Sequence, residues 1–303
     1  MLWNKDYFER LNERIGLPEE AVGEFIGTAL RIESDEKALA EFGSIVDSVS
    51  LPDCENYLSA LESANRFAER YGINPLTLHA VMLIVFFERL EALYGEAGLS
   101  SDIFYNTAAD LTCKVRECMD VKGVPGVFVA YWYKGFFNMT RFGIGRFEYE
   151  IKPIGCTAVF DDGETVPEGT ECLNFHIPSS GEPLADEARY DSYRRAFLFF
   201  NKLRKNGRTV FICHSWLLFP DNREFLPPRS NILRFANDFT FVEREEQTEF
   251  EDAWRIFGAA AEGPAEDLPE ETSLQRSVKE RLVKGRPLGL GLGAFRFDGE
   301  KIY

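Results

Sequence analysis

Two of the three histidines in this chain stand at the ends of apolar segments, directly before a turn. His176 closes the segment 172–176 and His214 closes the segment 210–214. Near neutral pH an imidazole can act as a general base, a general acid or a hydrogen-bond donor to a carbonyl group. The structural alternative is a neutral histidine that is satisfied by backbone groups beside an apolar core. These two segment ends are where the chemistry of the chain should be sought.

The residue pattern around the two histidines predicts a strand, a helix and a second strand. A parallel crossover of this kind is short and right-handed, so the two strands should be neighbours. Ligands of open α/β sheets bind at the carboxyl ends of adjacent parallel strands. The helix is predicted over 186–204 because one stripe of it carries aromatic and apolar side chains, namely Tyr190, Tyr193, Phe197, Phe200 and Leu203.

The turn from Ile177 to Gly181 favours an anion site. Its small residues Ser179, Ser180 and Gly181 leave backbone N–H groups accessible, and the following helix adds the positive end of its dipole. Together these groups suit a pyrophosphate. An ordinary turn between a strand and a helix is the alternative.

A serine nucleophile is a weaker interpretation. Ser215 follows His214, but the G-x-S-x-G elbow is absent around it. Ser179 or Ser180 with His214 and an acid would make a triad, although a chain of this size permits many such combinations. The motif R-x-x-G-x-G at 286–291, a pattern linked to acyl-CoA phosphates, follows a predicted helix and enters a strand. A final glycine-rich strand with a close backbone approach is the better interpretation.

Composition predicts a soluble protein with an acidic surface. The 303 residues include 50 acidic and 34 basic side chains, and the formal net charge is −16. Such a surface repels nucleic acids and anionic membranes, so neither is an expected partner. No leader sequence is visible, and the longest apolar run, Ala80–Phe87, is too short to span a bilayer. The six cysteines lack metal-ligand spacing, so we expect free thiols, no metal and a cytoplasmic location.

The sequence pattern changes near residue 139, which predicts two domains. Residues 1–138 are helical, and they include an apolar helix launched by Asn74-Pro75. Residues 139–303 mix strands and helices, with a first strand over Arg141–Ile151 and a second over 155–160. The expected fold class is mixed α+β: an all-helical N-terminal domain followed by a mixed sheet with flanking helices.

The succession of strands and helices in the second domain is similar to the core of the GNAT N-acetyltransferase superfamily, from its second strand onward. Individual stretches resemble a bacterial family of acyltransferase-like proteins, whose members join a helical N-acyltransferase N-terminal domain to a GNAT-like C-terminal domain. These stretches are Phe175–Gly181, Cys213–Leu218, Ser230–Phe235, Trp254–Gly258 and Leu268–Arg276.

The resemblance implies an acyltransferase. An acyl group, acetyl or another, would move directly from CoA to an amine of a small molecule or peptide, without a metal. In GNAT proteins the pantetheine lies between two splayed strands, which here end at His176 and His214. The pyrophosphate lies in the loop between the first of these strands and the next helix. The cofactor contacts implied here are Ile177, Ser179, Ser180 and Gly181, with Asn231 and Arg234 on a later helix.

The same resemblance suggests catalytic roles. His176 or Glu171 would take the proton of the amine, and His214 or Ser215 would polarise the thioester or protonate the leaving thiolate. The usual Q/R-x-x-G-x-G/A loop of the superfamily is replaced by Ile-Pro-Ser-Ser-Gly-Glu. A binding or regulatory protein that keeps the fold without the reaction is therefore the main alternative, and a Ser/His hydrolase is the third.

Overall fold

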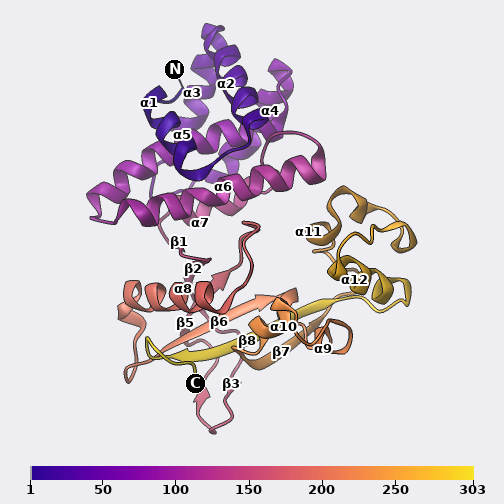
Figure 1. Ribbon diagram of the computed structural model, residues 1–303. Helices are drawn as coiled ribbons and strands as arrows, with labels where there is room; N and C mark the ends of the chain where they lie inside the picture. Colours follow the sequence, from indigo (N-terminus) through magenta and orange to yellow (C-terminus); the bar gives the residue numbers. More distant parts are fainter. Residues whose placement is uncertain (1) are drawn as a thin grey trace. The chain divides into compact units, whose positions relative to one another are not determined.

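The computed structural model describes residues 2–303, and the chain divides into two compact units. The helical unit extends to Gly143 and also includes Pro178–Ser180. The sheet unit comprises Ile144–Ile177 and Gly181–Tyr303. Both classes of secondary structure predicted from the sequence are therefore present, with helices first and a mixed sheet second (Figure 1).

The helical unit is built around one helix whose first half is almost entirely buried. Asn74 caps this helix through the backbone N–H of Leu76, and every residue from Thr77 to Phe87 is buried. Phe87 meets Tyr133 and Phe137 edge to face. The elements are α1 (Lys5–Ile15), α2 (Glu19–Glu33), α3 (Glu36–Asp47), α4 (Tyr57–Tyr71), the buried α5 (Pro75–Glu96), α6 (Ser101–Lys122), η1 (Ala130–Tyr133) and α7 (Lys134–Phe137).

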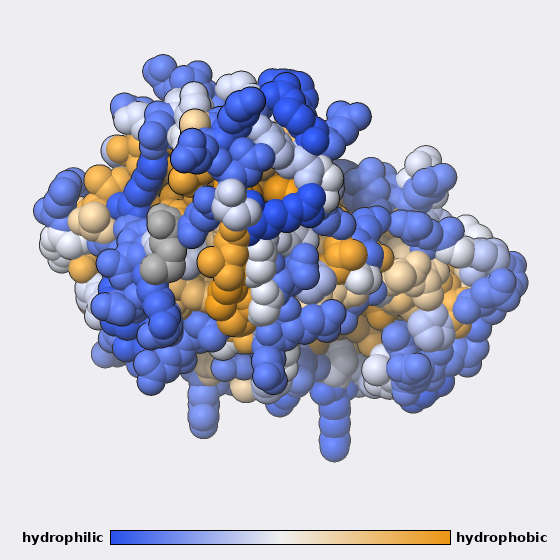
Figure 2. Space-filling model, turned by 90° about the horizontal axis from the view of Figure 1, so that it is seen from above, coloured by the Kyte–Doolittle hydropathy of each residue, from blue (hydrophilic) through white to orange (hydrophobic). Residues whose placement is uncertain are grey.

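The third histidine belongs to this core. His79 on α5 is buried, its Nδ1 lies 3.3 Å from the carbonyl oxygen of Val127, and burial lowers its pKa. It therefore has a structural role. Across residues 2–303 we find no helix with both the length and the apolar character needed to cross a membrane. The surface in Figure 2 is mostly hydrophilic, in keeping with the net charge of the chain.

The chain forms a six-stranded mixed sheet and a separate two-stranded ribbon. The sheet order is β1 (Arg141–Ile144), β2 (Phe147–Pro153), β5 (Glu171–His176), β6 (Thr209–Ser215), β8 (Gly289–Phe297) and β7 (Thr240–Glu246), and the ribbon pairs β3 (Ala158–Val159) with β4 (Thr165–Val166). The strands β5 and β6 are parallel, whereas the pairs β2–β5, β6–β8 and β7–β8 are antiparallel.

Helices and short helical turns connect these strands. α12 begins with a capping box, in which Thr272 and Gln275 each bond to the backbone N–H of the other, as the T-x-x-Q spacing predicts. The elements are α8 (Asp186–Phe199), η2 (Asn201–Leu203), η3 (Trp216–Leu218), α9 (Asn222–Phe225), α10 (Asn231–Ala236), α11 (Trp254–Phe257), η4 (Gly258–Glu262), η5 (Ala265–Asp267) and α12 (Ser273–Val283).

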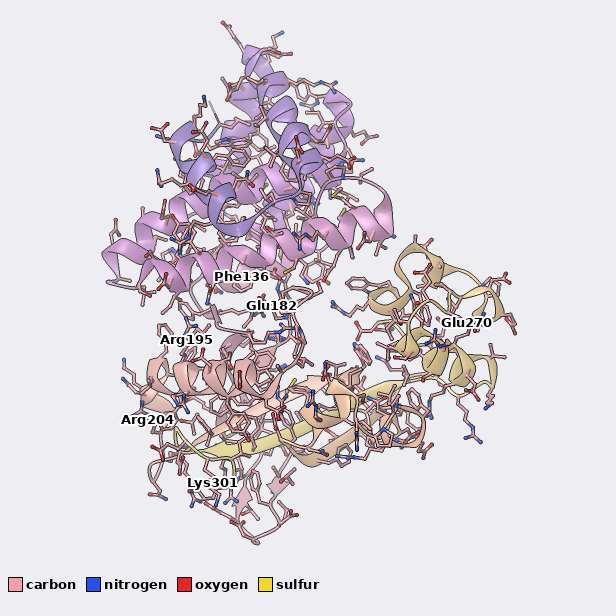
Figure 3. The ribbon with its side chains drawn as sticks, viewed as in Figure 1. Phe136, Glu182, Arg195, Arg204, Glu270 and Lys301 are labelled. Carbon is pink, nitrogen blue, oxygen red and sulfur yellow. The ribbon has the colours of Figure 1, made fainter. Side chains whose placement is uncertain are left out.

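The helix α8 packs on one face of the sheet through aromatic rings. The ring of Tyr193 lies 5.6 Å from that of Phe147 on β2, 5.8 Å from Phe211 on β6 and 4.9 Å from Phe295 on β8. The guanidinium of Arg204, labelled in Figure 3, donates to the carbonyl oxygen of Phe197 and so closes the helix at its C-terminal end. This face of the sheet is therefore fixed by a continuous aromatic layer.

Two strand predictions were wrong. The segment Arg141–Ile151 is two strands, β1 and the start of β2, because Gly145 turns the chain with a φ of +63°. A Cβ at Gly145 would lie 3.1 Å from the Cα of Ser192 on α8, so this turn also packs tightly. The expected strand over 155–160 is reduced to β3, which pairs with β4 outside the main sheet.

The glycines of β8 allow close backbone packing, as the sequence pattern predicted. A Cβ on Gly291 would lie 2.1 Å from the carbonyl oxygen of Leu218, and one on Gly293 would lie 2.8 Å from the ring of Phe239. The chain that follows β6 thus lies directly against β8, with no room for a side chain between them.

We expect Gly291→Ala to destabilise the protein by about 1–3 kcal/mol, because the added methyl group overlaps backbone that cannot rotate away. Gly155→Ala is the matched control, since a Cβ there has no heavy atom within 4 Å. Urea unfolding followed by circular dichroism measures both variants. Equal midpoints for the two variants would contradict the packing described here.

Candidate active site

The central feature of the sheet is that the pairing between β5 and β6 stops before either strand ends. This parallel pair has only two Cα partners, Leu173 with Phe211 and Asn174 with Ile212. On its other side β5 stays paired with β2 as far as His176. β6 likewise stays paired with β8 as far as Ser215. The carboxyl-terminal parts of β5 and β6 therefore separate from each other while their outer partners hold them in the sheet.

Both histidines flank this separation on one face. His176 lies two residues beyond Asn174, and His214 lies two residues beyond Ile212, its register partner. Side chains alternate along a strand, so all four point to the same side of the sheet. Phe175 and Phe211 point the other way, toward Tyr193 of α8. The sequence-based expectation that the histidines lie on neighbouring parallel strands is met.

His176 is held by a carboxylate that sequence reasoning missed. Its Nε2 lies 2.8 Å from Oε1 of Glu150 on β2. The side-chain amide of Asn174 lies 3.2 Å from the same oxygen and 3.1 Å from Nε2. We assign the proton to Nε2, which donates to Glu150, because Oε1 then accepts from two N–H groups. The proton-accepting atom of this imidazole is then Nδ1.

His214 also faces a carboxylate. Its Nε2 lies 3.2 Å from Oε2 of Glu245 on β7, and both side chains are largely exposed, at 41% and 53%. The register between β7 and β8 shifts between Phe241 and Glu243, which marks a β-bulge. The extra residue reverses the side-chain alternation, so Glu243 and Glu245 share the face of His214. The bulge thereby brings acidic side chains to this side of the site.

The other two catalytic candidates lie elsewhere. Glu171 is exposed at the start of β5, five residues from His176 and therefore roughly 16 Å away along the strand. The hydroxyl of Ser215 accepts the backbone N–H of Leu217 and caps η3. Ser215 also points to the opposite face from its neighbour His214. Neither geometry supports the role expected from the sequence.

The predicted anion loop is less favourable than the sequence indicated. The hydroxyl of Ser179 donates to a carboxylate oxygen of Glu117 on α6, which Lys114 also contacts. A carboxylate at this position opposes a second anion. α8 begins only at Asp186, after the loop. Its first turn carries Asp186 and Glu187, whose negative charges already neutralise the positive end of the helix dipole.

The end of this loop and the helix α10 carry the other cofactor contacts that the sequence predicted. Gly181 has a φ of +79°, and the carbonyl oxygen of Glu182, labelled in Figure 3, accepts from Arg146. Asn231 and Arg234 are both exposed on α10, where the guanidinium of Arg234 donates to the amide oxygen of Asn231. Arg234 has no carboxylate partner within residues 2–303.

A cavity of about 410 Å³ lies where β7 ends and β8 begins. Its central acid, Asp221, accepts hydrogen bonds from Arg244 and Arg281. Burial raises the pKa of Asp221, but the two arginines outweigh this effect and the net shift is downward. Arg286 lines the same cavity, as do Glu224 and Glu246. Three acids and three arginines therefore line this cavity, so its formal charge gives no preference for an anion.

The thiols near the separation are poor nucleophiles. Burial raises the pKa of Cys172 to about 11 and raises that of Cys213 strongly. At pH 8 a thiol with a pKa near 11 holds over 100-fold less thiolate than one of ordinary pKa, by an order-of-magnitude count. A covalent acyl-cysteine route is therefore disfavoured.

We expect a disulfide-exchange reagent at pH 8 to label the half-buried Cys156 first, and to leave Cys172 and Cys213 unlabelled until the protein unfolds. Peptide mapping by mass spectrometry after timed labelling provides the measurement. Labelling of Cys213 in the native protein as fast as Cys156 would show that this thiol is accessible and reactive.

Comparison with solved structures supports this fold over almost the whole chain. An acyltransferase variant in complex with octanoyl-CoA superposes with a TM-score of 0.69 at 20% identity, covering 97% of this chain and 88% of that one. An acyltransferase in complex with decanoyl-CoA and teicoplanin gives 0.66 at 21% identity, covering 94% and 86%. No curated protein sequence matches the chain.

Two family patterns match the sequence. The N-acyltransferase N-terminal domain matches residues 6–139, and the GNAT-like C-terminal domain matches residues 141–295. The second pattern alone covers more than half of the 303 residues. The chain belongs to the acyltransferase family that joins an N-acyltransferase N-terminal domain to a GNAT-like C-terminal domain.

Proposed function

We propose that this protein transfers an acyl group from acyl-CoA to an amine. The observation that carries the proposal is the end of the β5–β6 ladder at Asn174 and Ile212, beyond which His176 and His214 lie on the same face of the sheet. Unpaired strand edges present backbone N–H and C=O groups that need partners. The two amide groups of a pantetheine arm have the chemistry to satisfy them.

The acyl group that we favour is longer than acetyl. Two similar solved structures hold octanoyl-CoA and decanoyl-CoA. The acceptor that we propose is an amine of a small molecule or peptide. One similar acyltransferase was solved with teicoplanin, a precedent for an acceptor of this size.

The phosphate groups of CoA would be bound mainly by backbone N–H groups of the loop and not by its serine hydroxyls. We propose that backbone N–H groups of Ile177 and Gly181 bind the pyrophosphate, and that the hydroxyl of Ser179 stays with Glu117. The segment 223–234 supplies positive charge beside α10. Its three arginines, Arg223, Arg229 and Arg234, outnumber its one acid, Glu224, and form no ion pair within residues 2–303, whereas the whole chain has a formal net charge of −16.

The chemistry follows from the two histidines. The nitrogen of the acceptor attacks the thioester carbon, so a C–N bond forms and the C–S bond breaks. His176 accepts the proton from nitrogen at Nδ1, and the resulting imidazolium is stabilised by Glu150. His214, when protonated, donates a proton to the leaving thiolate. This direct route needs neither a thiol nor a serine nucleophile.

Binding is the first test. We expect calorimetric titration to give micromolar dissociation constants for octanoyl-CoA and decanoyl-CoA and weaker binding of acetyl-CoA. Binding of acyl-CoA without release of free CoA across a panel of amines would instead favour a regulatory protein that keeps the fold. No binding of any acyl-CoA at millimolar concentration would exclude the proposed function.

His176→Ala should lower kcat for acyl transfer by about 10²–10⁴-fold, the usual contribution of a general base. Glu171→Gln and Ser215→Ala should retain activity within about twofold, because one side chain lies far from the separation and the other acts as a cap. Free CoA released from acyl-CoA and an amine is followed with a thiol reagent. Full activity in the His176 variant would remove this residue from the mechanism.

A further inference from the structure

Resting on the proposed function, we propose that Glu150 is a positioning residue that fixes the orientation and tautomer of His176. It holds the imidazole by Nε2, so that the proton of the acceptor is taken at Nδ1. The sequence around Glu150 gives no indication of this role, because only the strand register brings the two side chains together.

The register explains why Glu150 reaches His176. Glu150 is the Cα partner of Asn174, and His176 lies two residues further on the same face of β5. Diagonal neighbours of this kind lie about 7–8 Å apart at their Cα atoms, which a glutamate side chain spans. The Oε1–Nε2 distance of 2.8 Å is that of a good charge-assisted hydrogen bond.

Asn174 makes this arrangement rigid. Its side chain is almost fully buried, at 4% exposed, and its amide donates to Oε1 of Glu150, the same oxygen that accepts from Nε2 of His176. An oxygen that accepts from two N–H groups has one preferred position. Glu150 therefore cannot swing away without breaking both contacts.

Glu150 acts more strongly on His176 than it would if the two side chains were fully exposed to water. The side chains of His176 and Glu150 are 28% and 18% exposed, against 41% and 53% for His214 and Glu245. Partial shielding from water strengthens the attraction between opposite charges. Other charged groups also lie on this face. On β2 they are the buried Glu148, which is the Cα partner of His176, and the exposed Lys152. Beyond the separation they are His214 and, on β7, Glu243 and Glu245.

Histidine NMR tests the inference without depending on turnover. The chain has three histidines, so ¹⁵N spectra of histidine-labelled protein contain three side-chain systems, and His176→Ala assigns one of them. We expect neutral His176 to carry its proton on Nε2 in the wild type. In Glu150→Gln, which preserves shape but removes the charge, its titration midpoint should fall by about one pH unit.

Kinetics provide the matching readout. Glu150→Gln should lower kcat by about tenfold or more, leave KM for acyl-CoA within twofold, and move the acidic limb of the pH profile to lower pH. Glu150→Asp, which keeps the charge, should restore part of the rate. Lys152→Gln, on the same strand and face, is the control and should behave as the wild type in both experiments.

The outcomes separate the two proposals. An unchanged His176 titration in Glu150→Gln, with unchanged melting temperature, would overturn the positioning role whether or not the protein is an enzyme. Absence of acyl transfer by the wild type, with the titration shifted as expected, would reject the proposed function while leaving the Glu150–His176 coupling established. A lower melting temperature with an unchanged pH profile would show that Glu150 is only structural.

Discussion

The structure of the sheet unit depends on a ladder that stops early. β5 and β6 share two residue pairs, and each remains fully paired on its outer side. Twist between strands accumulates along a parallel pair, and a pair anchored on both outer sides separates where its own hydrogen bonds end. The separated ends expose backbone groups that a ligand can satisfy. The candidate catalytic residues are therefore judged by how near they lie to the point where β5 and β6 separate.

The rest of the sheet unit keeps the separation in place. On one face, Phe211 and Phe295 stack with ring centroids 4.9 Å apart, and Tyr193 of α8 packs across both. Gly291 lets the chain after β6 lie directly against β8. Aromatic packing and close backbone contact leave β6 little freedom to return to β5. The opposite face carries the two histidines and their carboxylates.

Sequence patterns could predict the elements but not the register between them. Periodicity and capping gave α5, α8 and α12, and apolar segments gave β5, β6 and β8. The resemblance of short stretches to an acyltransferase family was confirmed by the family comparison. The turn at Gly145 was missed because glycines inside an alternating segment also suit a continuous strand.

Only part of the candidate site could be predicted, because the sequence does not show the register between the strands. His176 and His214 close apolar segments, a local signal that the sequence shows directly. Glu150 and Glu245 reach them only through cross-strand register and a β-bulge, neither of which has a local sequence signature. The partner of Ser179 was likewise invisible, since Glu117 lies 62 positions earlier in the chain. Tertiary pairing, rather than residue type, decides these contacts.

A crystal structure of the protein with a non-transferable decanoyl-CoA analogue tests the central claim most directly. The account predicts that the pantetheine lies between β5 and β6 beyond Asn174 and Ile212, with its sulfur on the face of the sheet that carries His176 and His214. An analogue bound instead in the cavity lined by Arg244 and Arg281, with the β5–β6 separation empty, would contradict it.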